Sequence, residues 1–517
     1  MKTALTAAML AALTLPAGAT ELRFASTTDP NTLDPNAGNS APVFSLLGNV
    51  YEGLVRRGRD MSVEPALATA WAPIGDGEGW RFTLREGVTF HGGEAFTAED
   101  VIFSYERASS EESDTSSWFA SVDRMEADGD FAVNVYTNGP NPIFVDGIAN
   151  WMMMDSGWAA ANGAERPNIE QGNYATLNAN GTGPYRITER QPGLKTTLEA
   201  FDGWWGEDRG NVTTATFTPV QNSATAVAAL LSGELDLIEP VPVQDAARVE
   251  TAEGVDVIRG IEARVIMLGF PHDKDTLLTG GGVNPFQDAR VRQAVGHAIN
   301  VPAILQTVMR GSAAPATQLV SDAMRGYTSG LERPAYDPDM ARTLLAEAGY
   351  PDGFAFSLKC PNDRYLNDEA VCTAINAMLA QVGLSPAFET MPVANYWPTL
   401  REDDHDMYLL GWSPGTFDAE HPIRFLASTP NAEKKLGSWN FGGYSNARID
   451  ELLPMIQSEI DDTKRQAMLD EVATLLAEEA AYVPLYVQPL VWGVRDGVEV
   501  VQRPDNFLQI RWVEMAE

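Results

Sequence analysis

The run GWSPG at positions 411–415 matches G-x-S-x-G, the pattern that presents a serine nucleophile in α/β-hydrolases. In that arrangement the residue after the serine donates its backbone N–H to the oxyanion, and here that residue is Pro414, which has no N–H. A triad histidine is also missing from the expected place, because the last histidine of the chain, His421, follows Ser413 by only eight residues. We therefore predict that the chain is not an enzyme, and an exported hydrolase is kept as a remote alternative.

Metal and phosphate chemistry lack the required spacing. Gly280-Gly281-Gly282 is not followed by the Gly-Lys-Ser/Thr that completes a phosphate loop, so a flexible turn is expected there. The histidines show no pair at the helical spacing of metal ligands and no cysteine companion; they are His91, His272, His297, His405 and His421. We expect no metal site and no cofactor.

The charge of the chain excludes other partners. In 517 residues, 36 Lys and Arg against 71 Asp and Glu give a net charge of -35, which repels phosphate backbones and anionic lipid. Hydrophobic residues make up 44% of the chain, as in globular proteins, and its length predicts about two to four packed units. We expect no nucleic-acid partner and no attachment to a membrane surface.

The first 19 residues have the composition of a cleavable leader. Lys2 is followed by an uncharged apolar stretch at 4–15, and Ala17-Gly18-Ala19 provides a small-x-small cleavage pattern. The apolar stretch is shorter than the roughly 20 residues that span a bilayer. No cysteine stands at the cleavage point to carry a lipid. We predict a signal peptide over 1–19, a mature protein beginning near Thr20, and a periplasmic location without a lipid anchor.

Aromatic residues gather among many glycines and prolines between positions 395 and 444. Aromatic side chains on loops held by a scaffold suit a pocket that encloses a small molecule. For any single ring, core packing is the alternative, and we expect about half of them to lie in the core. The rings are Tyr396, Trp397, Tyr408, Trp412, Trp439 and Tyr444.

The chain has two cysteines, Cys360 and Cys372, twelve residues apart. An even number of cysteines in an exported chain favours a disulfide, and two separate buried thiols are the alternative.

The elements that must position these residues have clear local signals. Thr97 and Asp100 have capping-box spacing before a helix that buries Val101, and Asp337-Pro338 begins another helix that stops at Gly349. A helix from Asn222 to Gly233 passes into a strand over 235–238. This alternation of helices and strands predicts an α/β fold.

Several segments, in order, resemble one family. NVYEGL at 49–54, EPALATAW at 64–71, FTLREGVTFHGGEAFTAEDVIFSYERA at 82–108, GTGPY at 181–185 and LLGWSPGTFDAEHPIRFL at 409–426 are similar to segments of the family 5 extracellular solute-binding proteins of peptide-type ABC importers. The resemblance implies a two-lobed periplasmic binding protein fold of type II with an extra inserted domain and a hinge between the lobes. The implied segments are lobe I over 20–60, 181–262 and 490–517, inserted domain II over 61–180, and lobe II, or domain III, over 263–489.

The resemblance also implies a binding site and partners. Asp418 occupies the place of the acid that holds a ligand's amino group, with Glu420 as a possible substitute, and Arg364 is the nearest match to the arginine for the ligand's carboxylate. We expect Trp412, Trp397 and Tyr396 to contact the ligand as well. The expected ligand is a peptide or peptide-like solute, with a sugar, an opine or a metal chelate as alternatives. The expected partners are the permease subunits of an ABC importer, and the protein is expected to be a monomer.

Overall fold

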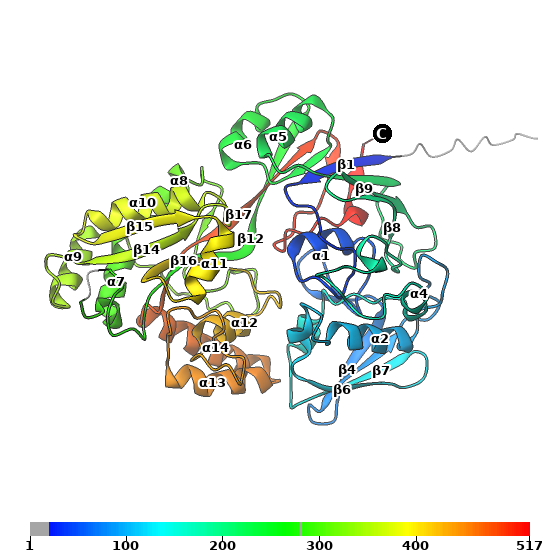
Figure 1. The fold of residues 1–517 in the computed structure, drawn as a ribbon, viewed down its shortest axis with the longest axis horizontal. Helices are drawn as coiled ribbons and strands as arrows, with labels where there is room; N and C mark the ends of the chain where they lie inside the picture. Colours follow the sequence, from blue (N-terminus) through cyan, green and yellow to red (C-terminus); the bar gives the residue numbers. More distant parts are fainter. Residues whose placement is uncertain (1–19, 280–281, 517) are drawn as a thin grey trace, which may run out of the picture.

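The computed structural model describes residues 20–279 and 282–516. The expected leader at 1–19 and most of the expected turn at 280–282 lie outside the described residues. Two groups of elements are joined near the top of the molecule by strands β12 and β17 (Figure 1). No helix in the described part of the chain is long and apolar enough to cross a membrane.

One mixed sheet runs through both lobes, in the order β15-β14-β16-β12-β17-β11-β1-β10-β9-β8, with β13 paired to β17. Its strands are β1 (Glu21–Ser26), β8 (Tyr185–Gln191), β9 (Lys195–Ala200), β10 (Thr214–Pro219), β11 (Leu237–Glu239), β12 (Val255–Gly269), β13 (Ala314–Pro315), β14 (Ala355–Pro361), β15 (Ser385–Met391), β16 (Met407–Trp412) and β17 (Tyr482–Arg495). β1 is parallel to β10 and β11, and β14 is parallel to β15 and β16. The two parallel groups lie on opposite sides of the antiparallel pair β12 and β17.

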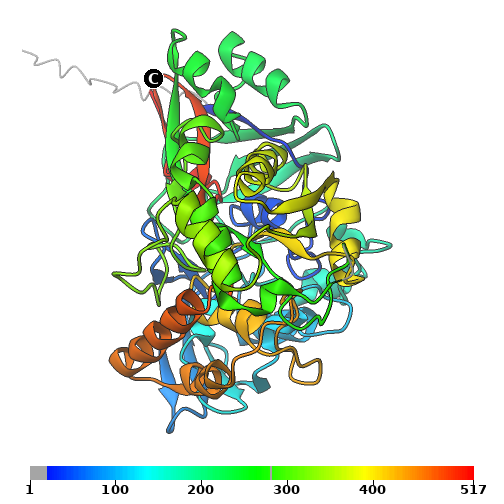
Figure 2. The ribbon, with the colours of Figure 1, turned by 90° about the vertical axis from the view of Figure 1, so that its left-hand side faces the viewer.

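The long strands β12 and β17 lie side by side and connect the lobes (Figure 1 and Figure 2). Their register pairs Ile261 with Pro489 and then shifts before Val265 pairs with Val487. The chain is expected to pass between the lobes after residue 262 and again after residue 489. These two positions therefore lie at nearly the same level of the two-stranded ribbon. A shift in register interrupts the ladder of hydrogen bonds, which makes this level a suitable place for a hinge.

A separate four-stranded sheet, in the order β4-β5-β7-β6, lies within the segment 61–180. Its strands are β4 (Ala68–Ile74), β5 (Gly79–Leu84), β6 (Val122–Ala127) and β7 (Ala132–Thr137). They share a core with helix α2 (Ala98–Ala108), in which Phe82, Val101 and Val133 are fully buried. This core is separate from the cores of the two lobes. The expected division of the whole chain into domains stays a prediction.

The remaining elements cover the sheets or join them. Two short pairs are β2 (Val55–Arg57) with β3 (Val63–Pro65) and β18 (Val498–Glu499) with β19 (Glu514–Met515). The other helices are α1 (Ala41–Leu47), α3 (Phe144–Gly147), α4 (Ser156–Ala161), α5 (Ser223–Ser232), α6 (Val243–Glu250), α7 (Ala289–Ala298), α8 (Val301–Thr307), α9 (Pro338–Glu347), α10 (Asp368–Ala380), α11 (Val393–Arg401), α12 (Glu420–Pro422), α13 (Ala447–Ser458) and α14 (Asp462–Glu478).

The local signals for three helices are confirmed. At α2, Thr97 and Asp100 form the expected capping box. At α9, the Asp337 side chain accepts from the backbone N–H groups of residues 339 and 340. At α5, Asn222 caps the start and Gly233 ends the helix with a φ of 78°, a left-handed conformation that glycine adopts without steric cost.

Candidate ligand-binding site

The two lobes touch through the side chain of Arg57. Its Nη2 donates to the backbone oxygen of Asp146 at 2.9 Å and to that of Thr416, in lobe II, at 2.8 Å. Its Nη1 donates to Asp146 Oδ1 at 3.0 Å, and its guanidinium lies over the ring of Phe417. A second contact joins the lobes where Gln244 of α6 donates to Asn367, just before α10. Both contacts lie outside the β12 and β17 ribbon that joins the lobes.

Charged side chains stand on this ribbon where it enters lobe II. Glu262 Oε1 accepts from Arg264 Nε and Nη2 at 3.1 and 2.9 Å, and Glu262 Oε2 accepts from Gln488 at 2.5 Å. The Arg264 guanidinium is thus already neutralised by a neighbour on the same strand. Sequence analysis missed this group, although the charged residues of Glu-Ala-Arg, just before the apolar second half of β12, were a usable signal.

Arg364 lies near this group and has no acid of its own. Within residues 20–279 and 282–516 its side chain forms no ion pair and donates no hydrogen bond, and it remains accessible to solvent. Partial desolvation by the surrounding chain, followed by the positive charge of Arg264, lowers the pKa of Arg364, although solvent still reaches the side chain. A guanidinium without an ion-pair partner can bind a carboxylate, because its paired N–H groups match the two carboxylate oxygens.

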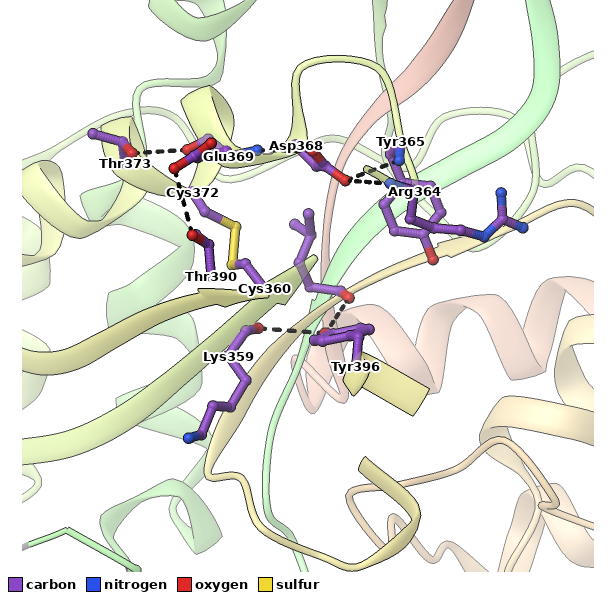
Figure 3. Close-up of a disulfide and its surroundings, with 11 residues drawn as sticks. Lys359, Cys360, Arg364, Tyr365, Asp368, Glu369, Cys372, Thr373, Thr390 and Tyr396 are labelled. Atoms are coloured by element: carbon purple, nitrogen blue, oxygen red, sulfur yellow. Dashed lines mark hydrogen bonds between the residues drawn. A yellow bond between two sulfur atoms is a disulfide. The ribbon is translucent and has the colours of Figure 1, made fainter. Parts of the chain in front are cut away.

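The loop that carries Arg364 is held in place by its neighbours. Asp368, at the start of α10, accepts from the backbone N–H groups of Arg364 and Tyr365, both at 2.9 Å. The Cys360–Cys372 disulfide, confirmed by the structure, joins β14 to α10 on either side of this loop. Figure 3 shows that the Arg364 guanidinium points away from the disulfide, while the backbone of the loop faces Asp368.

The tryptophans form a half-buried aromatic surface on lobe II. The Trp412 ring lies 5.6 Å from that of Trp439, which in turn lies 5.3 Å from that of Trp397. Trp412 Nε1 donates to His421 Nδ1 at 3.2 Å. Because an indole nitrogen only donates, His421 must carry its proton on Nε2. Burial lowers the pKa of His421 to about 3, which keeps it neutral.

The three tyrosines of the same region lie in the core instead. Tyr396 is fully buried, and its hydroxyl donates to the backbone oxygen of Leu409 at 2.7 Å. Tyr408 and Tyr444 are buried as well. Half of the six rings are therefore core residues. Tyr396, which we expected to contact a ligand, has no surface that a ligand could reach in this conformation, because its ring packs inside lobe II.

Asp418 differs most from the expectation. Its side chain is 1% exposed and forms a bidentate ion pair with Arg465 of α14, at 2.7 and 2.8 Å. Oδ1 also accepts from the backbone N–H of Glu420. The negative charge expected for a ligand's amino group already has a buried partner, 47 residues further along the chain. A role as amine anchor therefore stays a prediction, and it would require this pair to open.

Glu420 is also directed into lobe II. It is 1% exposed, and its Oε1 accepts from Gln457 at 2.6 Å and lies 3.4 Å from Arg424 Nε. Its Oε2 is buried and has no hydrogen bond to any described residue. Arg364 and the tryptophans Trp397 and Trp412 are thus the expected site residues with surface that a solute can reach. The part of the chain that the structure describes contains no cluster of three or more His, Cys, Asp or Glu that could hold a metal.

Comparisons with known proteins agree on the family. The family model described as "Bacterial extracellular solute-binding proteins, family 5 Middle" matches residues 62–434. The chain is 26% identical over 469 residues to the glutathione-binding protein GsiB of Escherichia coli (strain K12), covering 89% of this chain and 87% of the relative.

Solved structures share the whole fold. The ABC transporter substrate-binding protein CtaP from Listeria monocytogenes superposes with a TM-score of 0.84 at 21% identity, covering 96% of this chain and all of the other, 100%. The periplasmic binding protein DppA from Helicobacter pylori, in complex with the peptide STSA, superposes with a TM-score of 0.77 at 22% identity, covering 96% and 98%. The expected two-lobed α/β fold is confirmed, and the chain belongs to family 5 of the bacterial extracellular solute-binding proteins.

Proposed function

We propose that this protein captures a peptide or peptide-like solute between its lobes and delivers it to the inner-membrane permease of an ABC importer, without turnover. The names of its relatives support this choice, since one binds glutathione and another was solved with a bound peptide. Closure about the β12 and β17 ribbon would enclose the solute and present a closed shape to the permease.

The observation that carries the proposal is the unpaired guanidinium of Arg364. It stands on a loop fixed by Asp368 and the disulfide, beside the neutralised pair Glu262 and Arg264. An accessible arginine on a fixed backbone, without an ion pair to any described residue, suits the carboxylate of a zwitterion, and Trp412 offers an apolar surface on the same lobe. Asp418 and Glu420 would then support the loop from inside lobe II, rather than touch the solute.

Mass spectrometry of small molecules released by denaturing the protein, purified from its native periplasm, tests the solute class directly. A peptide or a peptide-like solute with a carboxylate is expected. An uncharged sugar as the only bound solute would contradict the proposal. An opine or a metal chelate would replace the peptide as the proposed solute class.

Calorimetry with the solute so identified tests the residue. Arg364→Gln should raise the dissociation constant by about 10- to 100-fold, the effect of one hydrogen bond to a charged group. Arg342→Gln is a matched control, because Arg342 is an exposed lobe II arginine on α9 that pairs with Asp339 in the preceding turn. Equal affinity of wild type and Arg364→Gln would remove Arg364 from the site.

Three further expectations belong to the same proposal. The solute should be recovered unchanged after long incubation with the protein, and steady product release would instead favour a hydrolase. The N-terminus of the exported protein should lie near Thr20. Light scattering should give the mass of a monomer.

A further inference from the structure

A pocket at the junction of lobe I and the segment 61–180 is lined by more basic than acidic side chains. It lies between the end of α1, the β2 strand and the C-terminal segment of the chain. Its charged lining residues are Glu52, Arg56, Arg57, Arg503 and Arg511. In a chain whose net charge is -35, four arginines at one pocket need an explanation.

Two of the four arginines are neutralised in place. Arg57 is paired with Asp146 at 3.0 Å, and Arg503 with Asp505 at 2.5 Å. Arg503 also donates to the backbone oxygen of Arg57 at 2.8 Å, which fixes one side of the pocket. These pairs form the frame of the pocket.

Arg511 is not neutralised in the same way. Its side chain is 4% exposed, and among the described residues its one polar partner is Asp208, to which Nη1 donates at 3.3 Å and whose side chain is 58% exposed. Its Nε and Nη2 have no hydrogen bond to any residue in the described ranges. Burial, followed by the charge of Arg56, lowers the pKa of Arg511 to about 9. The acid that Arg511 reaches is largely in water, where its charge is screened.

Arg56 is in a similar state. Its Nε is buried and has no hydrogen-bond partner among the described residues, and the nearest carboxylate oxygen, on Glu64, is 3.6 Å away. Arg56 and Arg511 thus line one pocket, and the acid paired with each of them, Glu64 or Asp208, is 42% or 58% exposed.

The one acid that lines the pocket does not supply the missing charge. Glu52 accepts hydrogen bonds from Trp204 at 3.2 Å, Thr182 at 3.0 Å and Trp205 at 2.7 Å, and it forms no ion pair within 4.0 Å in the described part of the chain. Burial raises the pKa of Glu52. The acids that pair with Arg57 and Arg503 are 22% and 5% exposed, whereas those beside Arg56 and Arg511 are 42% and 58% exposed, so the charges of Arg56 and Arg511 are the less well neutralised.

We propose that this pocket binds an oxyanion, a carboxylate or a phosphate group, between Arg56 and Arg511. Guanidinium groups bind both kinds of oxyanion through paired N–H donors. The site is separate from Arg364, which stands on lobe II. Because Arg57 lines the pocket and also contacts Thr416 of lobe II, the bound anion would lie beside the contact between the lobes. The anion could be a free ion or an acidic group of the captured solute, and this proposal does not depend on which solute that is.

Calorimetry with inorganic phosphate and with succinate, at low and constant ionic strength, tests the site in the full mature protein. One saturable site per chain is expected in wild type. Arg511→Gln and Arg56→Gln should each weaken it by about tenfold or more. Arg59→Gln is the matched control, since Arg59 also lies near Asp208, at 3.7 Å, but its side chain is 57% exposed and lies outside this pocket. The control should leave anion binding unchanged.

Absence of saturable binding of both anions to wild type would overturn the proposal, as would equal weakening by Arg59→Gln. If Arg511→Gln alters the fold, seen by near-ultraviolet circular dichroism, Arg56→Gln decides, because its side chain is 26% exposed and tolerates replacement more easily. Displacement of bound phosphate by glutathione would identify the site as one for a solute's carboxylate. Phosphate binding that glutathione leaves unchanged would identify a site for a separate small anion.

Discussion

Replacing Asp418 by Asn is expected to lower the unfolding free energy of lobe II, with little direct effect on the affinity for the solute. The two carboxylate oxygens of Asp418 accept from both terminal nitrogens of Arg465, and both side chains are at most 2% exposed. Asparagine keeps the shape of the side chain but leaves the Arg465 charge without its partner, inside the protein.

The magnitude follows from the burial of the pair. Removing one partner of a buried ion pair costs about 3 to 5 kcal/mol, because the other charge stays buried and uncompensated. Arg465 Nε would still donate to the backbone oxygen of Ile456, so part of the desolvation of Arg465 remains offset. We therefore expect about 3 kcal/mol, the lower end of that range. Replacing both residues, as Asp418→Leu with Arg465→Met, should cost less than Asp418→Asn alone, since no charge is then left unpaired.

Urea denaturation of the variants measures this, with Asp339→Asn as the control. Asp339 pairs with Arg342 on the surface and is 95% exposed, so its loss should cost less than about 1 kcal/mol. The reasoning would be refuted if Asp418→Asn lost less than about 1 kcal/mol of stability while solute binding, by calorimetry, fell by two orders of magnitude or more. That result would establish Asp418 as the amine anchor that the family resemblance suggested.

Three further outcomes are expected. Replacing Cys360 and Cys372 together by Ala should lower the unfolding free energy by about 3 kcal/mol, because the bridge closes a short loop in the unfolded chain, and alkylation of the denatured wild type should find no free thiol. Arg57→Gln should raise the radius of gyration of the solute-free protein in small-angle scattering, since it removes the hydrogen bond to Thr416 across the lobes; an unchanged radius in a folded variant would show that this contact does not hold them together. Burial raises the pKa of Glu239 to about 8, so the folded protein binds a proton there that the unfolded chain releases above pH 4.5; stability should fall as pH rises from about 4.5 to 8, and Glu239→Gln should flatten that part of the urea stability profile.

The sequence predicted those parts of the fold whose signals are local. Capping residues and glycines act within one helical turn, so Thr97, Asp337 and Gly233 placed three helices correctly. The segments that resemble the family, taken in their order along the chain, identified the family. The family resemblance then supplied the two-lobed architecture, which local signals do not contain. Register between distant strands, such as the pairing of Ile261 with Pro489, depends on residues more than two hundred positions apart and was beyond prediction from spacing.

The site was harder to predict, because a charged residue gains its role from its partner. Asp418 and Arg364 both matched expected positions, but only the folded chain reveals that Arg465 pairs with Asp418, whereas Arg364 forms no ion pair with any described residue. The same comparison separates two arginines of the pocket beside α1, since the acid paired with Arg57 is 22% exposed and the acid paired with Arg511 is 58% exposed. The chain has about twice as many acidic as basic residues, so an arginine that lacks a buried acidic partner is unusual in it. Such residues are therefore the first places to look for a bound anion.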